Sequence, residues 1–220
     1  MTRAMTLRTT AALLFTLALT TGCSMTHGDP KKPQKNSHPV KRYEVIVTAE
    51  APGPWDAVSG RAFFDVANVE CTPENKFLGV HKIPKDVVIN IEMTRVDEKT
   101  WNGYFYRDSI QDEDYYGLGV CHWDASAVAA DFVVHGETFT SSDTLEDLLQ
   151  KGHQTEYFKK REYLNQALTG DQAWVTTETD PEVAQHPDAF SRSRLPLKRL
   201  RHEPQPPSLC RRCKRCVQRS

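Results

Sequence analysis

The 220-residue sequence lacks long hydrophobic runs: apart from a short apolar stretch near the N-terminus, no segment reaches the length of a membrane-spanning helix. This excludes a protein that crosses a membrane several times. No collagen, coiled-coil or solenoid period is visible. HExxH and GxSxG motifs are missing, and no third glycine follows Gly117 and Gly119 at dinucleotide-binding spacing. We therefore expect no catalytic residue, no metal site and no cofactor.

The net charge of −1 conceals three segments of different sign. Residues 1–22 carry +2 and residues 191–220 carry +9, so residues 23–190 carry −12. Complementary charge steers association between proteins. The acidic central part therefore suits a basic protein partner.

The N-terminus has the pattern of an export signal. Arg3 and Arg8 precede an apolar segment, residues 11–19, that is too short to span a bilayer. Gly22 and Cys23 follow at once, and the stretch Thr-Thr-Gly-Cys resembles the lipobox of bacterial lipoproteins. The alternative is an ordinary cleaved signal peptide that contains a cysteine by chance.

This resemblance implies that residues 1–22 are removed and that Cys23 then carries acyl chains such as palmitate. Two or three chains hold a protein firmly on a membrane without a spanning helix. By the same resemblance, Ser24 implies transfer to the outer membrane and a protein that faces the periplasm. Thr20 departs from the leucine that is usual at its lipobox position.

Residues 23–42 are predicted to be the lipidated cysteine and a flexible tether. Pro30, Pro33 and Pro39 interrupt regular structure, and most of the other residues are small or polar. The five Lys and Arg side chains of this segment could touch anionic lipid, although a solvated linker is the simpler interpretation.

Residues 43–190 are predicted to fold as one domain, because apolar and polar residues alternate there with the period of half-buried strands. The predicted strands are residues 43–48, 61–69, 87–96, 100–107 and 125–135. Turns at residues 97–99 and 135–137 would join two pairs of runs into hairpins.

One short helix is predicted after Asp143. Asp143 is a good N-cap, Glu146 completes a capping box, and Gly152 suits the left-handed position after the last turn. Residues 154–168 fit a helix or a strand equally. Several strands with one short helix predict a mainly β domain: an antiparallel β-sandwich or a small open barrel.

Two cysteines, Cys71 and Cys121, lie in the predicted domain. An exported chain enters an oxidising compartment, so we expect these two to form a disulfide. Two unrelated thiols are the alternative. A Cys121–His122 nucleophile is also conceivable, but adjacent residues on a strand point to opposite faces.

Residues 191–220 are predicted to be a basic, unstructured tail, because the pattern of core-forming residues stops near Ser191. An out-of-frame reading of the gene's end would explain it. The tail offers three cysteines, Cys210, Cys213 and Cys216, and His202, but a zinc knuckle conflicts with export. Binding of nucleic acid or anionic lipid is the functional alternative. We expect no nucleic-acid partner for an envelope protein.

The densest polar cluster, residues 108–117, ends in Tyr-Tyr-Gly. Its carboxylates could act as a general acid and base, but they do not fit the calcium-loop template. An acidic hairpin loop or a binding loop is the simpler interpretation. Aromatic side chains beside carboxylates suit a protein-binding patch, whereas cross-strand packing is the alternative. The candidate binding residues are Trp101, Tyr104, Tyr106, Asp112, Asp114, Tyr115 and Tyr116.

Residues 101–123, from WNGYFYRD to DEDYYGLGVCHW, resemble a group of small proteobacterial lipoproteins of uncharacterised function. Some proteins of that sort accompany type VI secretion effectors, so the resemblance implies an immunity protein that blocks a secreted effector. We therefore expect a lipid-anchored, non-enzymatic binding protein of the bacterial envelope. An envelope hydrolase that uses Asp108–Asp114 and a structural or assembly lipoprotein are the alternatives.

Overall fold

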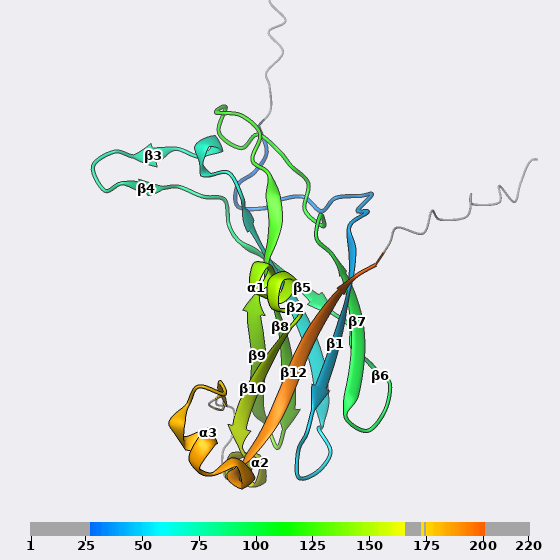
Figure 1. The fold of residues 1–220 in the computed structure, drawn as a ribbon. Helices are drawn as coiled ribbons and strands as arrows, with labels where there is room; N and C mark the ends of the chain where they lie inside the picture. Colours follow the sequence, from blue (N-terminus) through cyan, green and yellow to red (C-terminus); the bar gives the residue numbers. More distant parts are fainter. Residues whose placement is uncertain (1–26, 166–172, 174, 201–220) are drawn as a thin grey trace, which may run out of the picture.

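The computed structural model describes residues 27–165, 173 and 175–200, whose two larger β-sheets are antiparallel and pack face to face (Figure 1). The six-stranded sheet has the order β11 (Val175–Thr176), β10 (His153–Lys159), β12 (Phe190–Arg199), β1 (Arg42–Ala49), β7 (Thr100–Tyr106) and β6 (Thr94–Arg95). The four-stranded sheet has the order β5 (Val87–Ile91), β2 (Ala57–Val66), β8 (Trp123–Val134) and β9 (Glu137–Thr144). The predicted fold class, a mainly β antiparallel sandwich, is confirmed.

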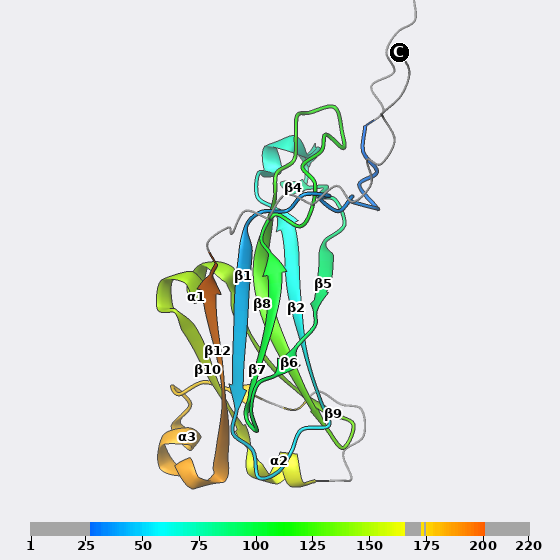
Figure 2. The ribbon, with the colours of Figure 1, turned by 90° about the vertical axis from the view of Figure 1, so that its right-hand side faces the viewer.

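Shorter elements lie at the two ends of the sandwich (Figures 1 and 2). They are η1 (Val69–Cys71), β3 (Glu74–Asn75), β4 (Val80–His81), α1 (Leu145–Lys151), α2 (Lys160–Leu164), α3 (Pro181–Gln185) and η2 (Pro187–Ala189). The ambiguous segment after residue 153 contains both a strand, β10, and a short helix, α2. No helix among the described residues is long and apolar enough to cross a membrane.

The core lies between the sheets, where alternation directs every second side chain inward. Trp55, from the loop between β1 and β2, joins the two layers: its ring centroid lies 5.1–5.5 Å from four other rings. These rings are Phe132, Phe139, Phe158 and Tyr163. Each such pair contributes about 0.5–1.5 kcal/mol beyond its buried area, so Trp55 ties both sheets together.

The predicted run of residues 87–96 does not form one strand. β5 pairs with β2 in one sheet and β6 pairs with β7 in the other, so the chain crosses between layers at residues 92 and 93. The crossing depends on Gly103, where a Cβ atom would lie only 2.6 Å from Met93 Sδ. The turn at 97–99 is confirmed, with Lys99 N donating to Asp97 Oδ1 at 2.8 Å.

The second predicted turn is confirmed as well: His135 and Gly136 have φ values of 53° and 84° between β8 and β9. The predicted helix exists as α1, but its N-cap is Thr144 and not Asp143. Thr144 has extended backbone angles, and its hydroxyl accepts a hydrogen bond from Asp147 N at 3.1 Å. Gly152 ends the helix in the left-handed conformation, as predicted.

The predicted boundary at residue 190 is wrong. β12 is a ten-residue strand that pairs with β1 on one side and β10 on the other. Its basic side chains Arg192 and Arg194 face solvent, whereas Ser193 and Leu195 are buried between the sheets. The basic side chains that suggested an unstructured tail thus lie on the outer, solvent-exposed face of a strand. Residues 201–220, with the three tail cysteines, lie outside the described residues.

The described part of the predicted tether, residues 27–41, is bonded to the domain. Asn36 N donates to Ser109 O at 2.8 Å, and the Asp108 carboxylate accepts from the N–H groups of Val40 and Lys41. The predicted flexibility is therefore wrong for this segment. Its backbone N–H groups donate hydrogen bonds to residues 108 and 109, which follow β7. Cys23 and residues 1–22 lie outside the described residues.

Candidate functional site

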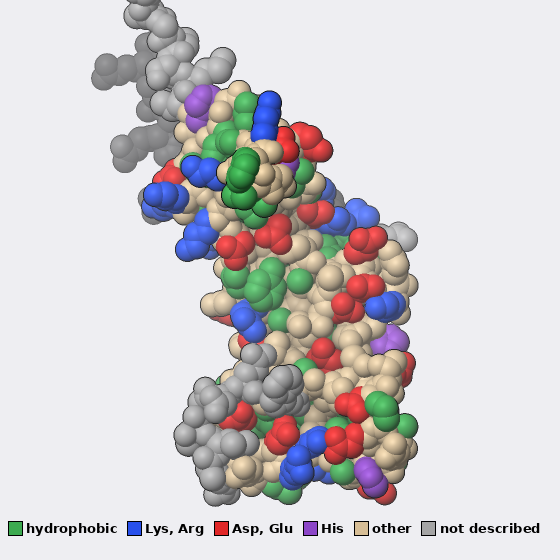
Figure 3. Space-filling view, turned by 90° about the vertical axis from the view of Figure 1, so that its left-hand side faces the viewer, with side chains coloured by type: hydrophobic (Ala, Val, Ile, Leu, Met, Phe, Trp, Pro, Cys, Tyr) green, Lys and Arg blue, Asp and Glu red, His purple; other side chains and the backbone are tan. Residues whose placement is uncertain are grey.

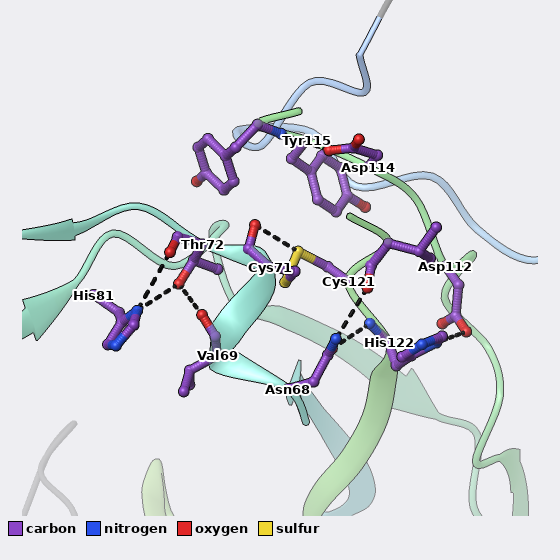
Figure 4. The surroundings of a disulfide bond; sticks show 12 residues. Asn68, Val69, Cys71, Thr72, His81, Asp112, Asp114, Tyr115, Cys121 and His122 are labelled. Atoms are coloured by element: carbon purple, nitrogen blue, oxygen red, sulfur yellow. Dashed lines mark hydrogen bonds and ion pairs between the residues drawn. A yellow bond between two sulfur atoms is a disulfide. The ribbon is translucent and has the colours of Figure 1, made fainter. Parts of the chain in front are cut away.

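One end of the sandwich carries a projecting lobe, which we define as residues 67–86 and 108–122 (Figures 1 and 2). The disulfide predicted between Cys71 and Cys121 is confirmed and joins the two segments of the lobe across 50 residues (Figure 4). Both cysteines are buried. With its sulfur in the disulfide, Cys121 is not a free thiol, so the Cys121–His122 nucleophile is wrong.

Side-chain hydrogen bonds reinforce the disulfide (Figure 4). Asn68 donates to Val120 O at 3.0 Å and accepts from His122 N at 2.6 Å. The Asp112 carboxylate lies 2.7 Å from His122 Nδ1 and accepts from Trp123 N at 2.9 Å. The lobe is therefore braced where β8 begins.

The acidic loop uses its carboxylates to hold backbone. Asp112 accepts from Trp123 N, and Asp114 accepts from Tyr116 N and Gly117 N at 3.1 and 2.7 Å. Desolvation of Asp114 opposes ionisation, but the hydrogen bonds from Gly117 and Tyr116 outweigh it and lower the pKa of the carboxyl. Both predicted binding residues therefore hold the backbone of the loop in place.

The predicted patch of exposed aromatics is largely wrong, because packing in the core buries Trp101, on β7, and Tyr115, in the acidic loop. Trp101 and Tyr115 are only 7% and 4% exposed. Tyr115 accepts a hydrogen bond from Trp123 Nε1 at 3.1 Å, and burial raises the pKa of its phenol. Tyr106 and Tyr116 are half-buried.

Tyr104 alone of the predicted aromatics is exposed. It lies on the six-stranded sheet. The guanidinium carbon of Arg42 lies 4.1 Å from the centroid of the Tyr104 ring, and the Tyr104 hydroxyl donates a hydrogen bond to the Glu44 carboxylate. The predicted binding residues therefore do not form one surface: Asp112 and Asp114 are in the lobe, while Tyr104 belongs to β7.

Sequence reasoning missed the apolar tip of the lobe. The β3–β4 hairpin exposes Phe77 by 94%, Leu78 by 63% and Val80 by 53%, and hydrophobic side chains gather at the front of the lobe (Figure 3). A signal was present: Phe-Leu-Gly stands between Pro73 and Pro84, outside every alternating run. Large exposed apolar groups in one place indicate a contact surface.

A second feature is a pair of adjoining hollows that share Thr144, which we call the recessed face. The larger, about 620 Å³, lies where β2 ends and β8 begins, beside α1, and the smaller, about 430 Å³, lies on the outer side of the four-stranded sheet. Its lining includes the carboxylates Asp65, Asp124, Asp143 and Glu146, the arginines Arg61 and Arg107, and the apolar side chains Phe63, Ala127 and Leu149.

Both arginines of the recessed face are already paired. Arg107 forms a two-point ion pair with Asp124, and this hydrogen bonding raises the pKa of the guanidinium. Arg61 lies 2.7 Å from Asp131, which also accepts from Thr140 Oγ1. Asp143 lies 3.9 Å from Lys151 Nζ, so Asp65 and Glu146 are the lining carboxylates without an ion pair among the described residues, and they leave the recessed face acidic.

Among the described residues, no group of three or more His, Cys, Asp or Glu side chains is arranged to hold a metal ion. The chain matches no protein-family model, no curated protein and no solved structure. The arrangement of the described residues is thus the basis on which a function is proposed.

Proposed function

We propose that this chain is a lipid-anchored, non-enzymatic binding protein of the bacterial envelope that holds a basic protein partner on its recessed face. Acyl chains on Cys23 would fix it to the outer membrane, facing the periplasm. The observation that carries the proposal is the recessed face itself: two adjoining hollows lined by both apolar side chains and carboxylates. Such a combination suits a protruding Lys or Arg side chain of a partner.

The charges support this choice. Asp65 is exposed and in no ion pair within the described chain, and Glu146 bonds only to the uncharged Gln150. With Arg61 and Arg107 neutralised by their own carboxylates, a partner cation meets attraction with little competing repulsion. A secreted effector, blocked by this chain as an immunity protein, is the partner class that we put forward.

The acidic loop gives little support to the alternative of an envelope hydrolase. A general acid or base needs a carboxyl that can reach a substrate and exchange a proton near neutral pH. Asp108, Asp112 and Asp114 instead accept backbone hydrogen bonds, and the pKa of Asp114 is lowered. Their roles in holding loops are sufficient to explain them.

The test is a pull-down from the envelope of the native organism with the full chain as bait and mass spectrometry of the bound proteins. The variant carries Asp65→Lys and Glu146→Lys. The matched control carries Glu92→Lys and Glu98→Lys, which make the same charge change at exposed positions next to β6. We expect the first variant to weaken capture of the partner about tenfold or more, and the control to bind like the wild type.

Equal loss in both variants would indicate a non-specific charge effect and contradict the recessed face as the site. Capture of only cell-wall or outer-membrane components would favour the assembly lipoprotein instead. Turnover of an envelope substrate that disappears on mutating Asp112 and Asp114 would favour the hydrolase.

A further inference from the structure

We propose that the tip of the β3–β4 hairpin rests on an anionic phospholipid surface beside the lipid anchor. This inference relies on the proposed anchoring through Cys23, but not on the proposed protein partner. It assigns a function to the exposed apolar residues of the lobe, which neither the core nor the recessed face uses.

The first argument is position. His27 follows Cys23 by only four positions, and four residue steps span at most about 14 Å when fully extended. His27 lies on the lobe, with its Nδ1 3.8 Å from the Asp114 carboxylate, and Gly28 N donates to Asp114 O at 3.0 Å. An acylated Cys23 would therefore hold the lobe, and no other part of the domain as directly, next to the bilayer.

The same N-terminal segment is tied to the foot of the hairpin. Lys85 N, at the end of the returning limb, donates to Pro30 O at 2.8 Å. The hairpin and the N-terminal segment that leads to Cys23 are thus hydrogen-bonded to each other. The hairpin projects from the lobe (Figure 1). The short anchor segment therefore keeps the hairpin close to the membrane surface.

The second argument is the chemistry of the tip. Phe77 and Leu78 occupy the turn, and Val80 and Ile83 follow on the returning limb, all at least half exposed. A side chain that is 94% exposed, as Phe77 is, contributes nothing to the folded core. Insertion into the interface between headgroups and acyl chains would remove these groups from water.

The third argument is charge. Exposed lysines accompany the apolar tip, and none of them is in an ion pair within the described residues; they are Lys31, Lys32, Lys76, Lys82 and Lys85. Basic side chains, together with acidic ones, border the hydrophobic patch of the lobe in Figure 3. Apolar groups with unpaired lysines beside them match an anionic bilayer surface, where the lysines meet the headgroups.

The fourth argument is preorganisation. Asn75 Oδ1 accepts from Phe77 N and Leu78 N at 3.1 and 3.2 Å, and Gly79 supplies a positive φ of 65°. At the base of the hairpin, His81 Nδ1 lies 3.1 Å from Thr72 Oγ1, next to the disulfide (Figure 4). The turn is therefore already shaped to present Phe77 and Leu78, which lowers the entropy lost on contact.

Contact at the lobe would also set the orientation of the domain. The lobe lies at one end of the sandwich and α2 and α3 lie at the other (Figures 1 and 2). With the tip on the membrane, the lobe end of the sandwich lies nearest the bilayer and the end with α2 and α3 lies farther from it.

The experiment uses the full, exported chain reconstituted in vesicles of phosphatidylethanolamine and phosphatidylglycerol with brominated acyl chains, which quench tryptophan on contact. Phe77→Trp places an indole at the tip. Val96→Trp is the matched control, because Val96 is 60% exposed in the turn between β6 and β7, at the end away from the lobe. Mass spectrometry of the intact protein establishes separately whether Cys23 is acylated.

With Cys23 acylated, we expect the F77W indole to shift to shorter wavelength and lose about half of its emission. The V96W protein should match the wild type. Replacing phosphatidylglycerol by phosphatidylcholine should weaken the effect.

An acylated F77W protein whose added emission stays solvent-like would overturn this inference and leave the proposed function untouched. An F77W signal that responds to envelope protein but not to vesicles would overturn it in favour of a protein partner. Absence of acylation would overturn the anchor and this inference with it.

Discussion

The surroundings of individual carboxyl groups in this protein shift their pKa values in opposite directions. Asp108 and Asp114 both accept backbone N–H groups, and, despite desolvation, hydrogen bonds from Gly117 and Tyr116 lower the pKa of the Asp114 carboxyl. Glu156, on β10, is only 8% exposed, and burial raises the pKa of its carboxyl, with the charge of Asp143 adding to the effect. Glu156 therefore opposes folding when ionised.

Replacing Glu156 by Gln should stabilise the protein at neutral pH. A carboxyl whose pKa is raised in the folded state is destabilising above that pKa, and the cost fades as pH falls toward the unfolded value. We expect Glu156→Gln to unfold at a higher temperature than the wild type at pH 7. The difference should shrink as pH falls through the raised pKa toward about 4.5, the ordinary value for glutamate. Thermal unfolding followed by circular dichroism measures this.

The control for this prediction is Glu98→Gln, an exposed residue in the turn before β7. It should change the unfolding temperature little at any pH, because a solvated carboxyl loses no hydration on folding. A Glu156→Gln protein that is less stable than the wild type at pH 7 would mean that the charged carboxylate contributes more through its hydrogen bonds than its burial costs.

Residue types were easier to predict from the sequence than their exposure. The pairing of Cys71 with Cys121 followed from compartment and number. The burial of Trp101 and Tyr115 did not follow, because aromatic side chains are equally common in cores and at interfaces. Only the folded arrangement decides between the two.

At the scale of elements, β12 closes the six-stranded sheet by pairing with two neighbours at once. Without it, β1 and β10 would each lose a partner, although neither is at the edge of the sheet. Its central apolar residue is Leu195, which is fully buried. A strand from the predicted tail is thus part of the core.

Truncating that side chain tests the role of β12. Leu195→Ala should lower the free energy of unfolding by about 2–5 kcal/mol, the usual cost of removing a fully buried leucine side chain. Arg194→Ala, whose side chain faces solvent on the same strand, is the control and should change it by less than about 0.5 kcal/mol. Urea unfolding of both variants gives the two values. A Leu195→Ala protein as stable as the control would show that β12 contributes little to the folded core.

The elements that sequence reasoning predicted well are those with local signals. Alternation found β1, β8 and the start of β5, and capping chemistry found α1 within one residue. β12 was missed because four basic residues in ten outweighed its short apolar alternation. The split of 87–96 between two sheets was missed because only the distant Gly60 and Gly103, close to Met93, make the crossing possible.

At the scale of the whole molecule, the antiparallel sandwich could be predicted. Parallel strands need long connections, usually helices, and the sequence shows few helical segments between its strands. The strand order could not, since partners such as β1 and β12 lie about 150 residues apart and share no local signal. The lobe was also missed. It contains few strand residues, so its shape depends on the disulfide and on side-chain hydrogen bonds that span 50 residues or more.

The disulfide lies in the lobe, and we expect the lobe to be less stable than the sandwich without it. By the chain-entropy argument, closing a loop of 50 residues contributes roughly 4 kcal/mol. The sandwich has its own core of packed aromatic rings, whereas the lobe has few buried side chains. Loss of the disulfide should thus act on the lobe first.

We expect Cys71→Ala with Cys121→Ala to lower the free energy of unfolding by up to about 4 kcal/mol and to leave the sandwich folded. Hydrogen exchange should speed up at the amides of Glu113 and His122, which are bonded within the lobe, far more than at Val45 or Val128 in the sheets. Reductant should reproduce this pattern in the wild type and have no effect on the double variant, which makes the two proteins controls for each other. Equal acceleration at all four amides would mean that lobe and sandwich unfold as one unit, and that the disulfide stabilises the whole domain.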